Sequence, residues 1–274
     1  MFEIRPPGPR RARRGHLALL GLLVAVRAAA FDTSRIADAE VRACAERALP
    51  SDTMTQLQAV EVVDKHGFVR ESRRSVQWKR DIAGESRVLV RVLEPPDERG
   101  LAVLISDDGR SDVVSFMTYS PKIKRVRRVS GDSFFGSVLG TDFTYEDFQY
   151  FYRVDEREQV DRVADDVIEG HPVYVLETVK PDDNSHYRLV RFSIDQRLCL
   201  PMRTDFIAPN GELRKQLVVA REEVREVDGK WVPFRTTMFD HKHETHTVFL
   251  VEEVEIDPEL DASLFEVGEL RRGN

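Results

Sequence analysis

Residues 88–105 read VLVRVLEPPDERGLAVLI and show the pattern that recurs along most of the chain. Two runs of β-branched and other apolar residues, 88–93 and 101–105, flank a turn built on Pro95, Pro96 and Asp97. Short apolar runs separated by tight turns are typical of antiparallel meanders, and here the turns recur about every ten to fifteen residues. The sequence therefore predicts a mainly β protein with one large curved antiparallel sheet of roughly ten or eleven strands.

The run 101–105 (LAVLI) lacks the alternation of apolar and polar residues that a half-exposed strand shows. In an antiparallel sheet, this predicts a core on one face and a second apolar environment on the other. Two sheets packed as a sandwich and a barrel with an apolar interior both satisfy the pattern. The clearest helical segment precedes the strands, at residues 34–49, where Ser34 can cap the helix and Pro50 stops it.

The first thirty residues have the layout of a secretory signal peptide. Five arginines precede an uncharged apolar run, 17–26, and small residues follow at 28–30. The run is too short to span a bilayer, which needs about 20 residues. We expect cleavage after Ala30 and a mature periplasmic protein of residues 31–274 forming one domain. A twin-arginine signal and an uncleaved amphipathic tail are the alternatives. No cysteine at the junction offers a site for lipidation.

The composition restricts the function classes further. The chain has 274 residues, is 41% hydrophobic and carries a net charge of −7, so it can bury a core and does not have the basic balance expected of a nucleic-acid-binding protein. Two cysteines are too few for a disulfide scaffold or a four-ligand zinc site. Cys44 and Cys199 could pair after export, but the pattern fits two buried thiols as well, and we favour unpaired thiols.

Residues 133–148 stand out because they combine glycines with large aromatic rings. The first part, with two glycines among polar and aromatic residues, is too irregular for a strand or a helix and predicts a loop. Its rings must cover something, either as a fixed plug or as a movable lid over an apolar cavity. A lid would admit an acyl chain, and twelve to sixteen carbons at roughly 0.8 kcal/mol per methylene offer about 10 kcal/mol before ordering costs.

Three stretches together resemble the LolA-like outer-membrane lipoprotein-sorting protein family: YSPKIKRVRR at 119–128, SFFGS at 133–137 and TDFTYED at 141–147. Flanking hairpins agree in order, and the resemblance runs from about residue 53 to residue 265. The chain departs from the family pattern at residues 138–141, which lengthen the loop, and at Phe135, where methionine is usual.

The resemblance implies a half-open antiparallel barrel lined by apolar side chains, with helices and loops over the opening. It also implies a non-enzymatic periplasmic carrier of a lipid or lipoprotein acyl chain, without a cofactor or metal, in some members beside an inner-membrane exporter of the RND or MMPL type. A non-catalytic adaptor subunit of an export complex is the alternative. We expect eight residues to line or gate the cavity: Trp78, Leu104, Phe116, Phe134, Phe135, Phe143, Tyr145 and Phe148.

A basic run between residues 122 and 128 offers a surface for lipid phosphates or an anionic partner. Its candidate residues are Lys124, Arg125, Arg127 and Arg128, and the competing interpretation is a solvated strand that protects a sheet edge.

His241, His243 and His246 lie close together beside Asp240 and suggest a metal-dependent hydrolase as a second alternative. An exposed polar hairpin explains this histidine cluster as well. Three further carboxylates, Asp142, Glu146 and Asp147, have no nucleophile beside them and are better explained as caps of a short helix at 144–151.

Overall fold

The computed structural model describes residues 38–48, 52–80, 85–107, 114–152, 160–179 and 185–272. The predicted signal peptide and its cleavage site lie outside the described residues. None of the described helices combines the length and the apolar character needed to cross a membrane.

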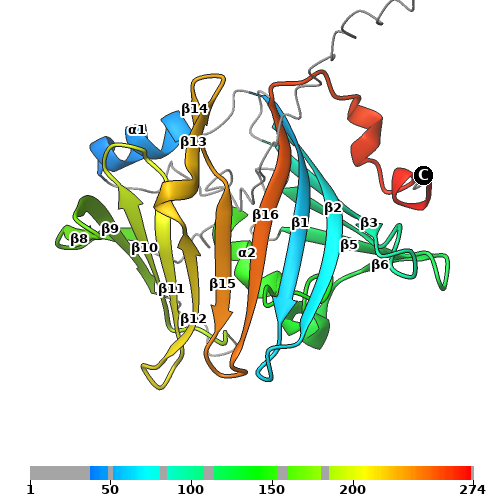
Figure 1. Cartoon of the computed structure of the whole chain (residues 1–274), viewed down its shortest axis with the longest axis horizontal. Helices are drawn as coiled ribbons and strands as arrows, with labels where there is room; N and C mark the ends of the chain where they lie inside the picture. The colour runs from blue at the N-terminus through cyan, green and yellow to red at the C-terminus, as the bar shows by residue number, and fades with distance from the viewer. Residues whose placement is uncertain are drawn as a thin grey trace, which may run out of the picture.

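Within the described residues, fourteen strands form one antiparallel sheet, in the order β6-β5-β4-β3-β2-β1-β16-β15-β12-β11-β10-β9-β7, with β8 also paired to β9. Figure 1 shows the two halves of this sheet splayed on either side of β15 and β16. The strands are β1 (Thr53–Val63), β2 (Val69–Arg80), β3 (Ser86–Glu94), β4 (Ala102–Asp107), β5 (Ser115–Ser120), β6 (Arg125–Arg128), β7 (Val160–Arg162), β8 (Asp166–Ile168), β9 (His171–Val179), β10 (Leu189–Asp195), β11 (Pro201–Ile207), β12 (Leu213–Val219), β15 (Arg235–Asp240) and β16 (Thr245–Ile256).

The mainly β class and the antiparallel meander are confirmed, and the sheet is not closed, because its end strands β6 and β7 do not pair with each other in the described chain. Strand β16 returns beside β1 and joins the two halves. The expected number of strands was too low. Strands β7 and β8 have only three residues each, which is too short for alternation to be visible in the sequence. A separate hairpin, β13 (Val224–Val227) and β14 (Lys230–Pro233), follows the short helix η4 (Arg221–Glu223).

Helix α1 (Ala39–Ala48) lies within the predicted segment 34–49, and Asp38 caps it, whereas Ser34 and Pro50 lie outside the described residues. The Asp38 carboxylate accepts the backbone N–H groups of Glu40 and Val41, and it also binds Arg162 at 2.6 Å. The hydrogen bond from Arg162 and the backbone N–H bonds lower the pKa of Asp38.

A disulfide joins Cys44 of α1 to Cys199 in the turn between β10 and β11, so the expectation of two unpaired thiols was wrong. The bond fastens α1 to the second half of the sheet, which contains β9 to β12, across 155 residues of sequence.

The sheet buries both of its faces in the region of β3 to β5. Val103 and Ile105 belong to the main core on the concave face, whereas the intervening Leu104 packs with Leu89 in a smaller cluster on the opposite face. The C-terminal segment, with η5 (Ala262–Phe265) and η6 (Glu269–Arg272), covers this smaller cluster. Figure 1 shows the segment outside the half of the sheet that contains β2 to β6. The second apolar environment of residues 101–105 is therefore the chain's own C-terminal segment rather than a second sheet.

Candidate functional site

The aromatic segment lies over the concave face of the sheet. It consists of the short helix η3 (Gly131–Phe135), a small hairpin in which Ser137 bridges to Thr144, and helix α2 (Tyr145–Tyr152). In Figure 1, α2 lies behind β15 and β16, between the two halves.

The helix predicted at 144–151 is confirmed to within one residue, and its start has the expected cap. Asp147 accepts the Thr144 N–H at 2.7 Å, and Thr144 Oγ1 accepts the Asp147 N–H at 3.2 Å.

A buried ion pair fixes this helix to the sheet. Lys215 of β12 donates from Nζ to Asp147 Oδ2 at 2.7 Å and to the backbone oxygen of Asp142 at the same distance. The side chains of Lys215 and Asp147 are 2% and 0% exposed, so neither charge has water as an alternative partner. Tyr187 donates its hydroxyl to Asp147 Oδ1 at 2.6 Å. Burial and the adjacent charge of Asp147 raise the pKa of Tyr187, so its hydroxyl keeps the proton that it donates.

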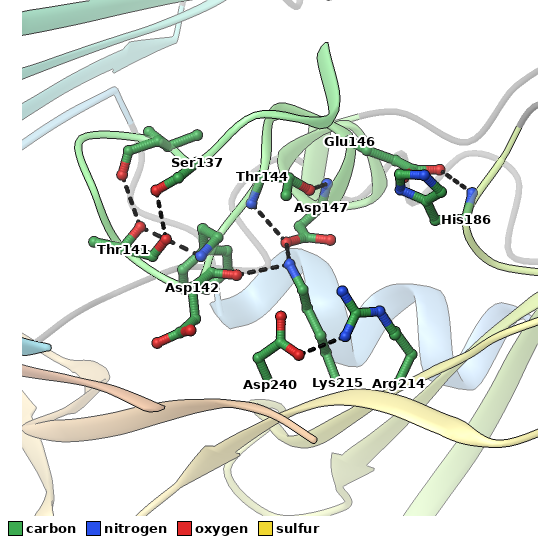
Figure 2. Close-up of polar contacts among 12 residues, drawn as sticks. Ser137, Thr141, Asp142, Thr144, Glu146, Asp147, His186, Arg214, Lys215 and Asp240 are labelled. Atoms are coloured by element: carbon green, nitrogen blue, oxygen red, sulfur yellow. Dashed lines mark hydrogen bonds and ion pairs between the residues drawn. The ribbon is translucent and has the colours of Figure 1, made fainter. Parts of the chain in front are cut away.

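Asp142 connects the hairpin to β16. Its carboxylate accepts the hydroxyls of Thr245 and Thr247, and its backbone N–H donates to Thr247 Oγ1 at 2.9 Å. Figure 2 shows Asp142, Asp147 and Lys215 converging between the hairpin and the sheet. Residues 141–148 are consequently pinned to the second half of the sheet.

Glu146 has a different environment from the other two carboxylates. It accepts the Ser185 hydroxyl at 2.7 Å and the His186 N–H at 3.0 Å, and the ring of Phe135 lies 4.3 Å from the ring of His186. Burial raises the pKa of Glu146, against the hydrogen bonds that it accepts, and the charge of Asp147 adds to the rise. All three carboxylates fasten the segment through hydrogen bonds, which extends the capping role that the sequence suggested.

Residues 131–140, which we call the aromatic loop, have fewer attachments than the segment that follows. The ring of Phe134 packs edge-on against Phe116 of β5 at 6.0 Å, and Val138 is buried in the concave core. Phe116 in turn contacts Tyr145 at 5.3 Å, which continues the aromatic cluster into α2.

Two arginines of β2 hold the tip of the aromatic loop. Arg74 donates to the backbone oxygen of Leu139 at 3.0 Å, and Arg70 donates to that of Gly140. Gly140 has a φ of 72°, and a Cβ there would collide with the Arg70 guanidinium. Two of the four residues that lengthen the loop relative to the family pattern are thus the ones that these arginines hold. Sequence reasoning missed Arg74 and Lys215, although each shares a strand face with apolar neighbours.

Six of the eight predicted lining and gating residues belong to or pack against the concave core, and Leu104 and Phe135 do not. Leu104 lies in the outer cluster under the C-terminal segment, which corrects its assignment to the lining, because residues 101–105 are apolar on both faces. The residues that belong to or pack against the concave core are Trp78, Phe116, Phe134, Phe143, Tyr145 and Phe148. Phe135 contacts Phe134 and His186 instead.

The basic run forms β6, which is an edge strand of the sheet, and the turn before it. Lys124, Arg125, Arg127 and Arg128 are exposed, and no ion pair involves them among the described residues. In the register with β5, Arg127 faces the same side as Thr118 and Phe116, whereas Arg128 faces the side of Met117. The four cations therefore surround the edge rather than forming one face.

The histidine cluster lies at the hairpin between β15 and β16. Asp240 accepts the N–H groups of Lys242 and His243, binds Arg214 and lies 3.0 Å from His243 Nδ1. Burial alone would raise the pKa of Asp240, but the His243 N–H bond and the charge of Arg214 lower it overall. Over the described ranges, no three His, Cys, Asp or Glu side chains are grouped to hold a metal. The geometry therefore gives the hydrolase hypothesis no support.

Comparisons with known proteins agree on the fold. A family model described as “-like: Uncharacterized protein” matches residues 84–272. No curated protein matches the sequence. A putative outer membrane lipoprotein-sorting protein domain from Vibrio parahaemolyticus is 20% identical, with a TM-score of 0.74, over 85% of this chain and 97% of that one. A DUF1329 family protein from Desulfovibrio piger is 18% identical, with a TM-score of 0.74, over 84% and 96%.

A LolA superfamily protein from Nitrosomonas europaea is 19% identical, with a TM-score of 0.63, over 84% of this chain and 98% of that one. The expected likeness to the LolA-like family is confirmed at the level of the fold.

Proposed function

The chain belongs to the family whose model matches residues 84–272 and has a LolA-like fold, and we propose that it is a periplasmic carrier that binds a lipid or lipoprotein acyl chain on its concave face. This proposal rests on one observation: the two parts of the aromatic segment over the concave face are attached to the sheet unequally. Residues 141–148 are fixed by a buried ion pair, whereas the aromatic loop is held mainly by ring contacts and by two arginines bound to its backbone oxygens.

The aromatic loop is the part that opens in this proposal. Gly131 and Gly140, with φ values of 57° and 72°, lie at its two ends and give it conformations that other residues disfavour. When Phe134 leaves Phe116, the apolar surface of β2 to β5 becomes available to a hydrocarbon chain. Phe143, Tyr145 and Phe148 stay in place as a fixed wall. The hydrocarbon chain would thus gain the apolar contacts that the aromatic loop loses. The free energy of opening the loop and that of binding the hydrocarbon chain would then nearly cancel.

The proposed periplasmic location has two independent supports. The first thirty residues have the pattern of a secretory signal. The disulfide between Cys44 and Cys199 is of the kind that persists in oxidising compartments such as the bacterial periplasm.

Two adjacent residues of β4 provide a matched test. Ile105 faces the concave core and Leu104 faces the outer cluster, so tryptophan at either position overpacks the protein, but only at Ile105 does it occupy the proposed binding volume. We expect Ile105→Trp to weaken binding of a fluorescent fatty acid by roughly fifteenfold, the equivalent of two buried methylenes, and Leu104→Trp to leave it nearly unchanged.

The fluorescence titration is accompanied by mass spectrometry of lipids extracted from natively purified protein. The carrier proposal would be contradicted if the purified protein contained no lipid and did not bind the fluorescent fatty acid. Equal effects of the two substitutions would place binding elsewhere.

The exposed cations of β6 support a second candidate, an adaptor role in which this edge docks on an anionic partner such as an envelope exporter. Charge reversal at Arg125, Arg127 and Arg128 should then abolish co-purification with that partner and spare fatty-acid binding. Unchanged co-purification would leave the cations with the simpler role of protecting an edge strand.

A further inference from the structure

A buried cation, Arg74, lies in the concave face, and the hydrogen bonds that it donates go to neutral acceptors. Arg74 is 4% exposed, and its Nε and Nη2 donate to Ser72 Oγ at 3.1 Å and to the Leu139 backbone oxygen at 3.0 Å. No ion pair joins Arg74 to an acidic side chain within the part of the chain that the structure describes. Burial, with a contribution from the charge of Arg70 and against the more distant charge of Glu98, lowers the pKa of Arg74 to about 10, so Arg74 remains charged at neutral pH.

The neighbours of Arg74 are polar as well. Gln58 of β1 lies opposite Arg74 in the strand register, and its amide donates to Gln56 Oε1 at 2.8 Å. Both glutamines are buried on the same face. A buried charge with only neutral acceptors is costly, and an ion of opposite sign is what would compensate it.

The position of Arg74 is as informative as its charge. Inward-facing residues of β2 change from polar to apolar along the strand, from Ser72 and Arg74 to Val76 and Trp78. At the usual rise of a strand, Trp78 lies roughly 13 Å beyond Arg74. The inward face of β2 is therefore amphipathic along its length, with Arg74 directly under the aromatic loop.

We propose that Arg74 binds the anionic head of a single-chain amphiphile, either the carboxylate of a fatty acid or the phosphate of a lysophospholipid, whose hydrocarbon chain extends toward Trp78 and Phe116. The anion takes the place of the Leu139 backbone oxygen when the aromatic loop opens, as a charged acceptor for a charged donor. This inference rests on the proposed carrier function and narrows it, because the acyl chains of a lipoprotein are esters and amides and carry no such anion.

The test compares three ligands with similar chains: palmitate, palmitoyl lysophosphatidic acid and hexadecanol. Their affinities are measured by displacement of a fluorescent probe from wild type, Arg74→Met and Arg70→Met. Arg70 is the matched control because it also holds the aromatic loop, but its side chain is 49% exposed and pairs with Glu98. Circular dichroism and thermal unfolding establish that each variant is folded.

We expect Arg74→Met to weaken the binding of at least one anionic ligand by roughly tenfold to a hundredfold and to change the affinity for hexadecanol by less than about threefold. Which anion loses affinity identifies the carboxylate or the phosphate as the ligand group. Arg70→Met should change the affinities for all three ligands by the same factor.

An equal change for all three ligands in Arg74→Met would overturn the inference, because Arg74 would then act only on the aromatic loop. If wild type binds none of the three, the carrier proposal fails together with the inference. If wild type binds hexadecanol as tightly as palmitate and lysophosphatidic acid, the inference alone fails.

Discussion

The buried pair of Lys215 and Asp147 gives the sharpest prediction about what holds α2 in the concavity. Lys215→Met removes the cation and leaves a carboxylate that is 0% exposed with only neutral hydrogen bonds, from Thr144 and Tyr187. Losing one partner of a buried pair costs about 3–5 kcal/mol. For a protein of this size, each kcal/mol corresponds to roughly 2–4 °C in melting temperature, so the variant should melt roughly 6–20 °C lower.

A double-mutant cycle separates the pair from its surroundings. Asp147→Asn keeps an acceptor for Tyr187 but leaves Lys215 charged, and it should cost a similar amount. The variant with both substitutions buries no charge at this position, so its loss should be smaller than the sum of the single losses by about 2–3 kcal/mol. Urea unfolding followed by circular dichroism, with the disulfide intact, measures all four free energies of unfolding.

The control is Arg272→Met, which removes an ion pair whose arginine side chain is 78% exposed and should cost less than about 1 kcal/mol. A cost for Lys215→Met as small as that of the control, or additive effects in the cycle, would refute the conclusion that a buried ion pair pins residues 141–148 to the sheet.

Four further predictions concern separate elements. Replacing Cys44 and Cys199 by serine should lower the free energy of unfolding by about 5 kcal/mol, from the loop of 155 residues that the bond closes, and a loss under 1 kcal/mol would contradict this. Gly140→Ala, at a φ of 72°, should cost roughly 1–2 kcal/mol in urea unfolding and speed fatty-acid uptake in stopped-flow fluorescence; unchanged uptake would argue against the aromatic loop as the gate. Because the pKa of Glu146 is raised in the folded state, the stability that Glu146 contributes should be lost as the pH rises above its ordinary pKa of 4.5. Wild type should therefore lose stability relative to Glu146→Gln over this range, and parallel stability profiles between pH 4 and 8 would be inconsistent with the raised pKa. Phe265→Ala should cost about 3–5 kcal/mol and leave fatty-acid binding unchanged, since Phe265 lies on the outer face; weaker binding would mean that the two faces are coupled.

The strand pattern and the aromatic segment were predictable because they depend on local sequence. Alternation and turn residues reveal a meander, and glycines among aromatic rings reveal a loop that must cover apolar surface. Local pattern could not reveal which side of residues 101–105 meets the concave core, because both sides are apolar. Because the run shows no alternation, the sequence left Leu104 and its neighbours Val103 and Ile105 indistinguishable.

The contacts that hold residues 141–148 and α1 on the sheet could not be predicted, because they join residues far apart in the chain. Lys215 reaches Asp147 across 68 residues, and Cys44 reaches Cys199 across 155. A signal for the first was present: Lys215 shares a strand face with Leu217 and Val219, so a cation stood at a core position. Such a charge predicts a buried partner, but only the fold identifies the partner.

The proposed carrier function requires the aromatic loop to give way to an acyl chain on the concave face. Photolabelling with a fatty acid that carries a diazirine on its chain, followed by peptide mass spectrometry, measures this directly. We expect labelled peptides containing Trp78, Ile105 and Phe116, with labelling suppressed by excess palmitate. Labels confined to the outer face around Leu104 and Phe265, or no label that palmitate suppresses, would contradict it.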